Sequence, residues 1–348
     1  PVVREIIEWD EYTGRFRAID YVEVRARVSG YLEKIHFKDG QLVQKGDLLF
    51  TIDQRPFELA REQAQADLQQ ANTRLVLAEK ELKRAGQLLR KGYVSQSVFD
   101  QRLQTRNETR SAIDAAKAAL NRAKLDLEYS KIKSPISGRI SRYLVSVGNL
   151  IGGGSVGATH LTTIVSLDPI HFYFDAPEDA YLKYVRLDRS GQRPGSRSTA
   201  NSVYLSLSDE KGYPHKGEMN FVDNRFDAGT GTIQGRAIFS NPSLIFQPNM
   251  FARIRLLGSG KFKATMVPEE VIGTDQSRKF VYTVNNEGTV KLQLVTLGKL
   301  IDGLRVIRKG LSPDDWVIIK GIQRARSGVK VTPVKSAINL PGSTTAPR

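Results

Sequence analysis

The chain has 348 residues, a formal net charge of +15, 40% hydrophobic and 26% charged residues, which indicates a globular protein of roughly two to four domains. No run of about 18 apolar residues occurs, which argues against a spanning helix, and the absence of cysteine excludes disulfides and Cys-ligated zinc. The positive charge is spread along the chain without a nucleic-acid-binding motif, so we expect no nucleic-acid partner.

Two short segments of the chain form an internal repeat with a fixed offset. Residues 28–32, VSGYL, recur as residues 136–140, ISGRI. The same offset aligns three further pairs, namely Gly40 with Gly148, Val43 with Ile151, and Gly46 with Gly154. Apolar and polar residues alternate in residues 22–28, which predicts a strand. Because neither β unit has enough apolar surface to fold alone, we expect both copies to close into one small sandwich.

The segment between the two copies predicts two long antiparallel helices. Apolar residues recur at spacings of three and four on both sides of Gly92, as in a coiled coil. These seam residues are Ala64, Leu68, Ala71, Leu75, Ala78, Leu82, Ala85 and Leu89, then Ile113, Ala116, Leu120, Ala123 and Leu127. The break at residues 91–94 is short enough to force a return, and Ser95 or Ser97 can cap the second helix. Arms of about 50 Å cannot bury their outer face internally, so we expect this hairpin to reach a partner.

Beyond residue 163 the pattern predicts two further β regions. Alternating apolar residues in residues 170–174, 203–207 and 252–256 predict strands of a β-barrel, and a lone helix is expected at residues 177–187. A third β region runs from about residue 261 to residue 334. The strand-like opening of the chain, residues 2–17, has no partner nearby in the sequence, and we expect it to join this third region.

With these features the sequence resembles the HlyD-type membrane fusion proteins, specifically the adaptors of resistance-nodulation-division (RND) efflux pumps. Residues 24–32, VRARVSGYL, resemble the first lipoyl half-motif, and residues 127–138, which end in SPISG, resemble the second. Residues 230–251, from TGTI to PNMF, resemble the barrel signature. Asn249 stands where glycine is usual, and asparagine tolerates a left-handed backbone better than most residues. The resemblance covers roughly residues 11–334.

The resemblance implies a mainly β, elongated multidomain chain with a long α-helical coiled-coil hairpin. Its expected parts are a membrane-proximal β domain (residues 1–21 and 262–335), a lipoyl-like β sandwich in split halves (22–55 and 129–163), the α-helical hairpin (56–128), a β-barrel domain (164–261) and a disordered tail (336–348).

The resemblance also implies a contact site at the end of the hairpin. The family carries an Arg, a Leu and a Ser there, spaced four and then seven residues apart, that contact the outer-membrane channel. Arg84, Leu88 and Ser95 match that spacing. Leu88 would pack into a groove of the channel, while Arg84 and Ser95 would hydrogen-bond to it. The residues themselves also fit a solvated arginine, an additional core leucine and an N-cap serine.

As a member of that family, the chain would be a periplasmic adaptor associated with the inner membrane. It would link an inner-membrane RND transporter to an outer-membrane channel, form a ring of several copies, and stabilise and gate the conduit. The basic stretch 299–335 would contact anionic lipid headgroups or an acidic protein face, or be a solvated surface. Many members carry a lipidated N-terminal cysteine. We expect the chain, which starts at Pro1 without a signal peptide, to be a mature or trimmed form, and whether its precursor is lipidated stays open.

No catalytic, cofactor or metal site is expected from the residues. The G-x-S-x-G pattern at residues 153–157 lies in a glycine-rich β loop instead of a strand-to-helix turn, and the four histidines lack metal-ligand spacing. One alternative is an adaptor of an ATP-driven exporter or a type I secretion system. A lipoyl- or biotinyl-type carrier is disfavoured because the hairpin replaces the turn that would bear the modified lysine. A coiled-coil scaffold would not account for the lipoyl halves and the barrel.

Overall fold

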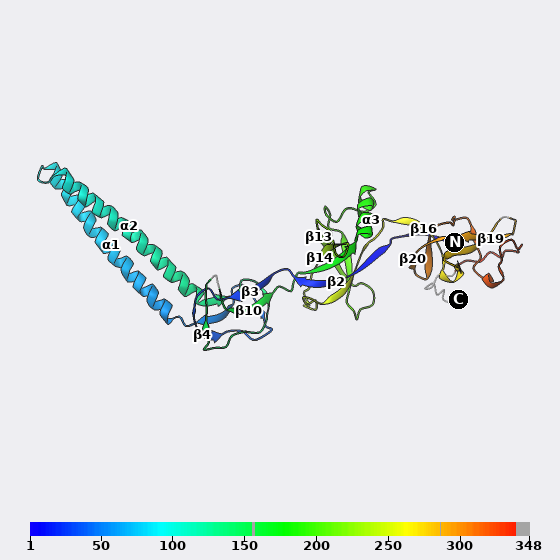
Figure 1. The fold of residues 1–348 in the computed structure, drawn as a ribbon, viewed down its shortest axis with the longest axis horizontal. Helices are drawn as coiled ribbons and strands as arrows, with labels where there is room; N and C mark the ends of the chain where they lie inside the picture. Colours follow the sequence, from blue (N-terminus) through cyan, green and yellow to red (C-terminus); the bar gives the residue numbers. More distant parts are fainter. Residues whose placement is uncertain (155–156, 286, 339–348) are drawn as a thin grey trace, which may run out of the picture. The chain divides into compact units, whose positions relative to one another are not determined.

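The computed structural model describes residues 1–154, 157–285 and 287–338, and it divides into two compact units (Figure 1). Each unit is assembled from segments far apart in the sequence. One contains residues 17–170 and 240–248. The other contains residues 1–16, residues 171–239 and the chain from residue 249 onward.

The first unit contains a sandwich of two four-stranded sheets, ordered β3-β10-β8-β5 and β7-β6-β4-β9. Its strands are β3 (Tyr21–Arg25), β4 (Gly30–Ile35), β5 (Leu42–Val43), β6 (Leu48–Ile52), β7 (Lys131–Lys133), β8 (Gly138–Ile140), β9 (Leu150–Ile151) and β10 (His160–Val165). Each sheet takes two strands from either side of the hairpin. The repeat is visible in the register, since Gly30 faces Ile151 and the equivalent Gly138 faces Val43.

The sandwich core joins apolar residues from both sides of the hairpin. Leu32, Leu49 and Ile52, which precede it, and Ile140 and Ile164, which follow it, are at most 1% exposed and belong to one cluster. Burial of this apolar surface, at about 25 cal/mol per Å², is the main term that holds together segments separated by the whole hairpin.

The hairpin consists of α1 (Arg55–Arg90) and α2 (Gln96–Tyr129), which run antiparallel side by side (Figure 1). The residues buried between them belong to the predicted seam, namely Leu75, Ala78 and Ala85 of α1 and Ile113 and Leu120 of α2. A salt bridge of 3.1 Å from Arg102 Nη1 to Glu81 Oε2 also links the two helices. No helix in the described part of the chain has the length and apolarity needed to cross a membrane.

The base of the hairpin is fixed to adjacent strands of one sheet. Phe50 of β6 faces Ile132 of β7, and the N–H of Ile52 donates to the carbonyl of Ser130 at 2.9 Å. Gln54 Nε2 donates to Ser130 Oγ at 2.9 Å. The first helix therefore begins, and the second ends, beside the same strand pair.

The second unit contains a closed barrel with the strand order β11-β14-β13-β12-β15-β2. Its strands are β2 (Trp9–Ala18), β11 (Ile170–Pro177), β12 (Ser202–Ser206), β13 (His215–Val222), β14 (Thr232–Phe239) and β15 (Phe251–Leu257). Inside it, the rings of Phe16 and Phe172 meet edge to face at 5.1 Å. Helix α3 (Glu178–Arg189) starts one residue after Pro177, which occupies the N-cap position.

The barrel corrects one part of the predicted organisation. The prediction that residues 1–21 lie with residues 262–335 is wrong for β2. Seven residues of β2, from Trp9 to Arg15, pair with β15 from Leu257 to Phe251. The alternation in this strand does not reveal its partner, and β2 is needed to close a barrel that would otherwise have two open edges.

Two asparagines of the barrel signature have structural roles. Asn241 is 1% exposed, and its Nδ2 donates to the carbonyls of Leu167 and Phe246 at 2.9 Å each. Asn249 has a φ of +70°, a left-handed backbone as expected at a position of the barrel signature where glycine is usual. The N–H of Asn249 donates to the carbonyl of Phe16 at 2.8 Å.

The last β region contains two further sheets, ordered β1-β16-β21-β20 and β17-β18-β19 with β22 beside β18. Its strands are β1 (Val2–Ile6), β16 (Phe262–Pro268), β17 (Gly273–Asp275), β18 (Arg278–Val284), β19 (Val290–Leu294), β20 (Thr296–Ile301), β21 (Leu304–Lys309) and β22 (Trp316–Val317). Two 3₁₀ helices, η1 (Glu269–Val271) and η2 (Ile322–Arg324), complete it. Most of the predicted tail, residues 339–348, lies outside the described residues, whereas Ile338 packs against the core of the first sheet.

Asp10 of β2 is the centre of a polar cluster in this unit. Its carboxylate accepts from Lys183 Nζ of α3 at 2.7 Å and from Lys299 Nζ of β20 at 2.9 Å, and the Tyr184 hydroxyl donates to it at 3.0 Å. Burial alone would raise the pKa of Asp10, but the hydrogen bonds from both lysines outweigh it and hold this pKa below its ordinary value. The ionised carboxylate is therefore the form that stabilises the fold.

We expect Asp10→Asn to lower the free energy of unfolding at pH 7 by about 1–2 kcal/mol, a value discounted because both lysines are partly exposed to solvent. A carboxyl with a lowered folded pKa stabilises the protein above its unfolded pKa of about 4 and loses that effect as the pH falls through the folded pKa. The difference between the two proteins should therefore shrink below about pH 4. This difference in the free energy of unfolding is measured by Trp9 fluorescence during urea unfolding, in a Trp316→Phe background.

Asp302→Asn, in an exposed pair with Arg4 at 3.9 Å, is the control and should change the free energy of unfolding little. A difference for Asp10→Asn that does not depend on pH would contradict the role assigned to the ionised carboxylate.

Gly138 should be irreplaceable in the sandwich because a β-carbon there would lie 2.1 Å from the carbonyl oxygen of Val165. We expect Gly138→Ala to lower the opening free energy of strands β8 and β10 by about 2 kcal/mol or more, which speeds amide hydrogen exchange about thirtyfold. Gly152→Ala is the matched control, since its nearest neighbour would be 3.7 Å away. Equal exchange rates in the two variants would refute this steric argument.

Candidate functional site

The hairpin tip (residues 84–95) is built on a backbone turn that ends α1. The N–H of Gly92 donates to the carbonyl of Leu89 at 3.0 Å, and the N–H of Tyr93 donates to the carbonyl of Leu88 at 3.1 Å. This pair of bonds is a Schellman motif, which requires a left-handed residue at its centre. Gly92 supplies it with a φ of +75°. The carbonyls of Leu88 and Leu89 are thus satisfied within the turn, without a partner protein.

Arg84 and Leu88 lie one helical turn apart on α1 and therefore on the same face. Arg84 is exposed and Leu88 is half-buried. Among the described residues, Arg84 forms no salt bridge, so its guanidinium is free to bind a partner. Leu88 is held by its backbone in the turn while part of its side chain remains in contact with solvent.

Ser95 occupies the N-cap position of α2, but its side chain makes no capping hydrogen bond. Its carbonyl accepts from the N–H of Val98 at 3.2 Å, and its side chain is exposed. Ser97 lies inside the first turn of α2 and so is not the cap. Because capping does not use the Ser95 hydroxyl, this group remains available as a donor and an acceptor.

The structure thus brings Arg84 and Leu88 together on one face and places Ser95 at the start of the opposite helix. Tyr93, which the sequence analysis did not single out, is 76% exposed in the turn between them. An aromatic residue directly after a turn glycine, outside the seam, is the signal that could have identified it. Exposed aromatic rings are frequent anchors in protein interfaces.

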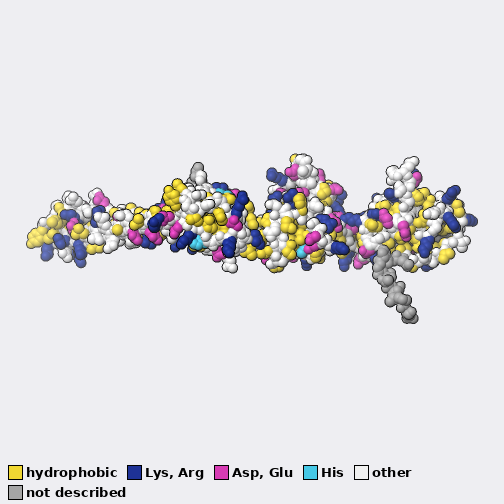
Figure 2. Space-filling model, turned by 90° about the horizontal axis from the view of Figure 1, so that it is seen from below, with side chains coloured by type: hydrophobic (Ala, Val, Ile, Leu, Met, Phe, Trp, Pro, Cys, Tyr) yellow, Lys and Arg dark blue, Asp and Glu magenta, His cyan; other side chains and the backbone are white. Residues whose placement is uncertain are grey.

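The charge of the hairpin tip is positive. Its basic residues form no salt bridge with any residue that the structure describes, and neither does the adjacent Lys83. These basic residues are Arg84, Arg90 and Lys91. The nearby Glu81 is already paired with Arg102. Figure 2 shows basic and apolar side chains next to one another at this end of the hairpin. A partner surface with carboxylates or free carbonyl oxygens around an apolar groove would complement it.

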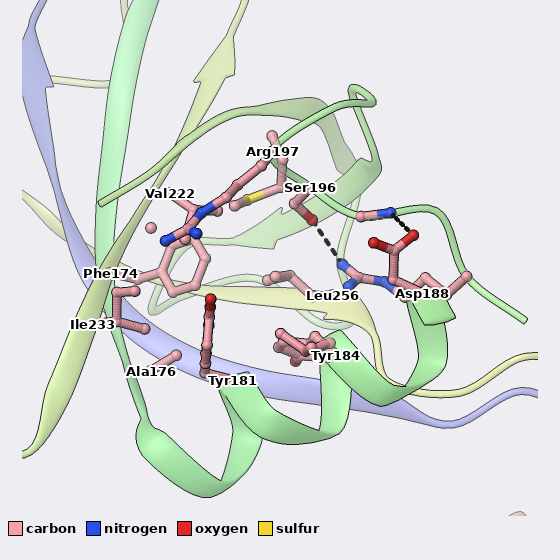
Figure 3. Close-up of a pocket in the computed structure, with 15 residues that line it drawn as sticks. Phe174, Ala176, Tyr181, Tyr184, Asp188, Ser196, Arg197, Val222, Ile233 and Leu256 are labelled. Carbon is pink, nitrogen blue, oxygen red and sulfur yellow. Dashed lines mark hydrogen bonds between the residues drawn. The ribbon is translucent and has the colours of Figure 1, made fainter. Parts of the chain in front are cut away.

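The barrel offers a second candidate, a recess under α3 (Figure 3). Its walls are mainly apolar and aromatic, and they include Phe174, Tyr181 and Leu256. Nothing in the sequence patterns pointed to it, because its residues come from four strands, a helix and a loop. Among the described residues there is no group of three or more His, Cys, Asp or Glu side chains placed to hold a metal ion. Ser155 of the G-x-S-x-G pattern lies outside the described residues.

Three models of one protein family match consecutive parts of the chain. They are the RND MFP (membrane fusion protein) barrel-sandwich hybrid domain at residues 20–163, the RND MFP β-barrel domain at residues 169–259, and the RND MFP C-terminal permuted SH3 domain at residues 263–324.

Curated relatives match over most of their length. The efflux pump periplasmic linker BepD of Brucella suis is 33% identical over 331 residues, which cover 94% of this chain and 83% of BepD. The multidrug efflux pump subunit AcrA of Escherichia coli is 33% identical over 322 residues, which cover 92% of this chain and 80% of AcrA. The crystal structure of MacA from Actinobacillus actinomycetemcomitans shares the fold with a TM-score of 0.55 and 21% identity, over 91% of this chain and 98% of MacA.

Gly92→Ala should loosen the hairpin tip, because a left-handed conformation costs alanine about 1 kcal/mol more than glycine. We expect the amide of Tyr93 to exchange about fivefold faster. Gly86→Ala is the matched variant and should have the opposite effect on the rate of amide exchange. Gly86 lies within α1, and a β-carbon there would contact the Phe99 ring at 3.4 Å. It should slow exchange in the last turns of α1 by a similar factor. The same direction of change in both variants would contradict this account of the turn.

Proposed function

The chain belongs to the RND membrane fusion protein family, and on that premise we propose that it is the periplasmic adaptor of a tripartite multidrug efflux pump. It links an inner-membrane RND transporter to an outer-membrane channel. The observation that carries this proposal is the ordered match of three family domains over residues 20–324. The similarity to BepD, a periplasmic linker, and to AcrA, an efflux pump subunit, supports it.

In this proposal the hairpin tip binds the outer-membrane channel. Leu88 supplies an apolar anchor, and Arg84 and Ser95 donate hydrogen bonds around it. Support comes from the exposure of Arg84 and from the Ser95 hydroxyl that capping leaves unused. An apolar centre surrounded by polar groups is the usual anatomy of a protein interface. Tyr93 adds an exposed ring beside this set.

In this proposal the adaptor acts by binding its partners and forming part of the conduit, and not by catalysing a reaction. Several copies assemble side by side into a ring, and the ring seals and gates the conduit between the two membranes. The energy for transport comes from the transporter, which also selects the compounds. The family role is non-catalytic, and we infer that this chain has no enzymatic activity of its own.

The last β region is the part we assign to the inner-membrane side. Within its basic stretch, residues 299–335, three residues are neutralised by pairs inside the chain, since Arg305 pairs with Glu269, Arg308 with Glu8 and Lys299 with Asp10. The other basic residues of this stretch are exposed and make no salt bridge within the described chain, namely Lys309, Lys320, Arg324, Arg326, Lys330 and Lys335. Such residues favour anionic headgroups or acidic faces of the transporter. A lipid anchor on the precursor would add a second attachment.

Cross-linking from a single thiol tests the polarity of the hairpin. The chain has no cysteine, so Ser95→Cys creates one thiol at the hairpin tip, and Ser111→Cys creates one on the exposed shaft of α2. In native Gram-negative cells treated with a short photoactivatable thiol reagent, we expect Ser95→Cys to form adducts with an outer-membrane channel protein, identified by mass spectrometry. The two positions are about 24 Å apart along the helix, so Ser111→Cys should give few channel adducts. Equal channel yields from both, or adducts of Ser95→Cys only with cytosolic proteins, would overturn the tip assignment.

A further inference from the structure

The barrel recess, lined in part by α3 and the loop that follows it, is not used by the adaptor function (Figure 3). It encloses about 110 Å³ and opens to solvent. Its apolar walls are Phe174, Ala176, Met219, Val222, Ile233 and Leu256. In a closed barrel of this size, side chains ordinarily fill the interior, so an unfilled apolar recess is a feature that needs an explanation.

A buried arginine lines this recess. Arg193 is 2% exposed, and its guanidinium lies 4.4 Å from the centre of the Tyr184 ring. One terminal nitrogen donates to Ser196 Oγ at 3.1 Å, whereas Nε has no hydrogen-bond partner among the described residues. A buried N–H without a partner is rare in folded proteins and destabilises them.

The neighbouring carboxylates do not neutralise Arg193 directly. Asp10 is bound by two lysines and Tyr184, and Asp188 accepts from the N–H of Gly195 at 2.8 Å. No carboxylate in the described part of the chain forms a salt bridge with Arg193. Burial lowers the pKa of Arg193 from its ordinary value, although an arginine keeps its charge at neutral pH. The recess is thus lined by a desolvated cation whose Nε is buried without a partner among the described residues.

The second arginine of the recess differs from Arg193 in its exposure to solvent. Arg197 is exposed, and one of its terminal nitrogens donates to the carbonyl of Asp223 at 2.7 Å. Solvent screens the charge of Arg197, so the buried Arg193 is the principal group for anion recognition inside the recess. A single guanidinium matches a monoanion, because a planar carboxylate accepts two parallel N–H bonds from it.

We propose that the barrel recess binds a small monocarboxylate with a compact apolar tail, whose carboxylate pairs with Arg193 and whose tail lies among Phe174, Ile233 and Leu256. The size follows from the enclosed volume. An apolar cavity of about 150 Å³ holds a benzene molecule, and the smaller recess continues outward to an open mouth, so one ring or a short branched chain is the largest tail that fits. This site is independent of the adaptor function proposed above.

Benzoate and its neutral analogue benzyl alcohol test the proposal on the full chain. We expect saturable benzoate binding in a titration followed by NMR or calorimetry, at least about tenfold tighter than that of benzyl alcohol, because a charge-assisted pair contributes such a factor. Arg193→Met should weaken benzoate binding at least about tenfold and change benzyl alcohol binding by less than about twofold. Arg189→Met, at the exposed end of α3, removes the same charge and should leave both affinities unchanged.

Three results would overturn the proposal. They are the absence of saturable benzoate binding up to about 10 mM, equal affinities for benzoate and benzyl alcohol, and equal losses in Arg193→Met and Arg189→Met. If Arg193→Met does not fold, the comparison of the two ligands on the unaltered chain decides. Cross-linking at the hairpin tip is unaffected by any of these results, so the two proposals can fail separately.

Discussion

Burial of the split sandwich core is the interaction on which the hairpin depends. The two β units lie at opposite ends of a long helical insertion, and each has an apolar face that it cannot bury alone. Their association brings Phe50 beside Ile132, and the adjoining strands lead directly into α1 and out of α2. Two helices whose ends are held at one strand pair, with a five-residue connection between them, can only run antiparallel. The projecting hairpin is therefore a consequence of closing the sandwich.

The hairpin divides its side chains between two tasks. Its seam uses alanine and leucine, which lets the helices approach closely, and near the end Gly86 of α1 makes room for the Phe99 ring of α2. The turn satisfies its own backbone through Gly92. Arg84 and Tyr93 remain exposed at the hairpin tip. A surface of this kind suits a protein that acts by binding, because its ordered backbone reduces the entropy lost on association.

The barrel uses buried polar groups in two different ways. Asp10 is fully paired by two lysines and a tyrosine, so it contributes a pH-dependent stability to the unit that contains it. Arg193, close by, keeps an unpaired nitrogen beside an apolar recess. A satisfied buried charge is explained by the fold itself, whereas an unsatisfied one calls for a ligand. The contrast between these two residues distinguishes a structural cluster from a candidate site.

Local periodicity determined the strands and the helical seam, because each is a pattern of neighbours a few residues apart. The internal repeat followed from comparing the chain with itself, and the fold class and the left-handed position of Asn249 followed from the family resemblance. The spacing of Arg84 and Leu88 places them on one helix face in any helix. Only the tertiary structure decided that β2 closes the barrel, since a strand's alternation shows which face is buried and not which distant strand it pairs with. It also decided that Arg193 is buried without a full set of partners. The recess beside Arg193 is lined by residues of four strands, a helix and a loop. No local spacing in the sequence shows that these distant segments lie together in the fold.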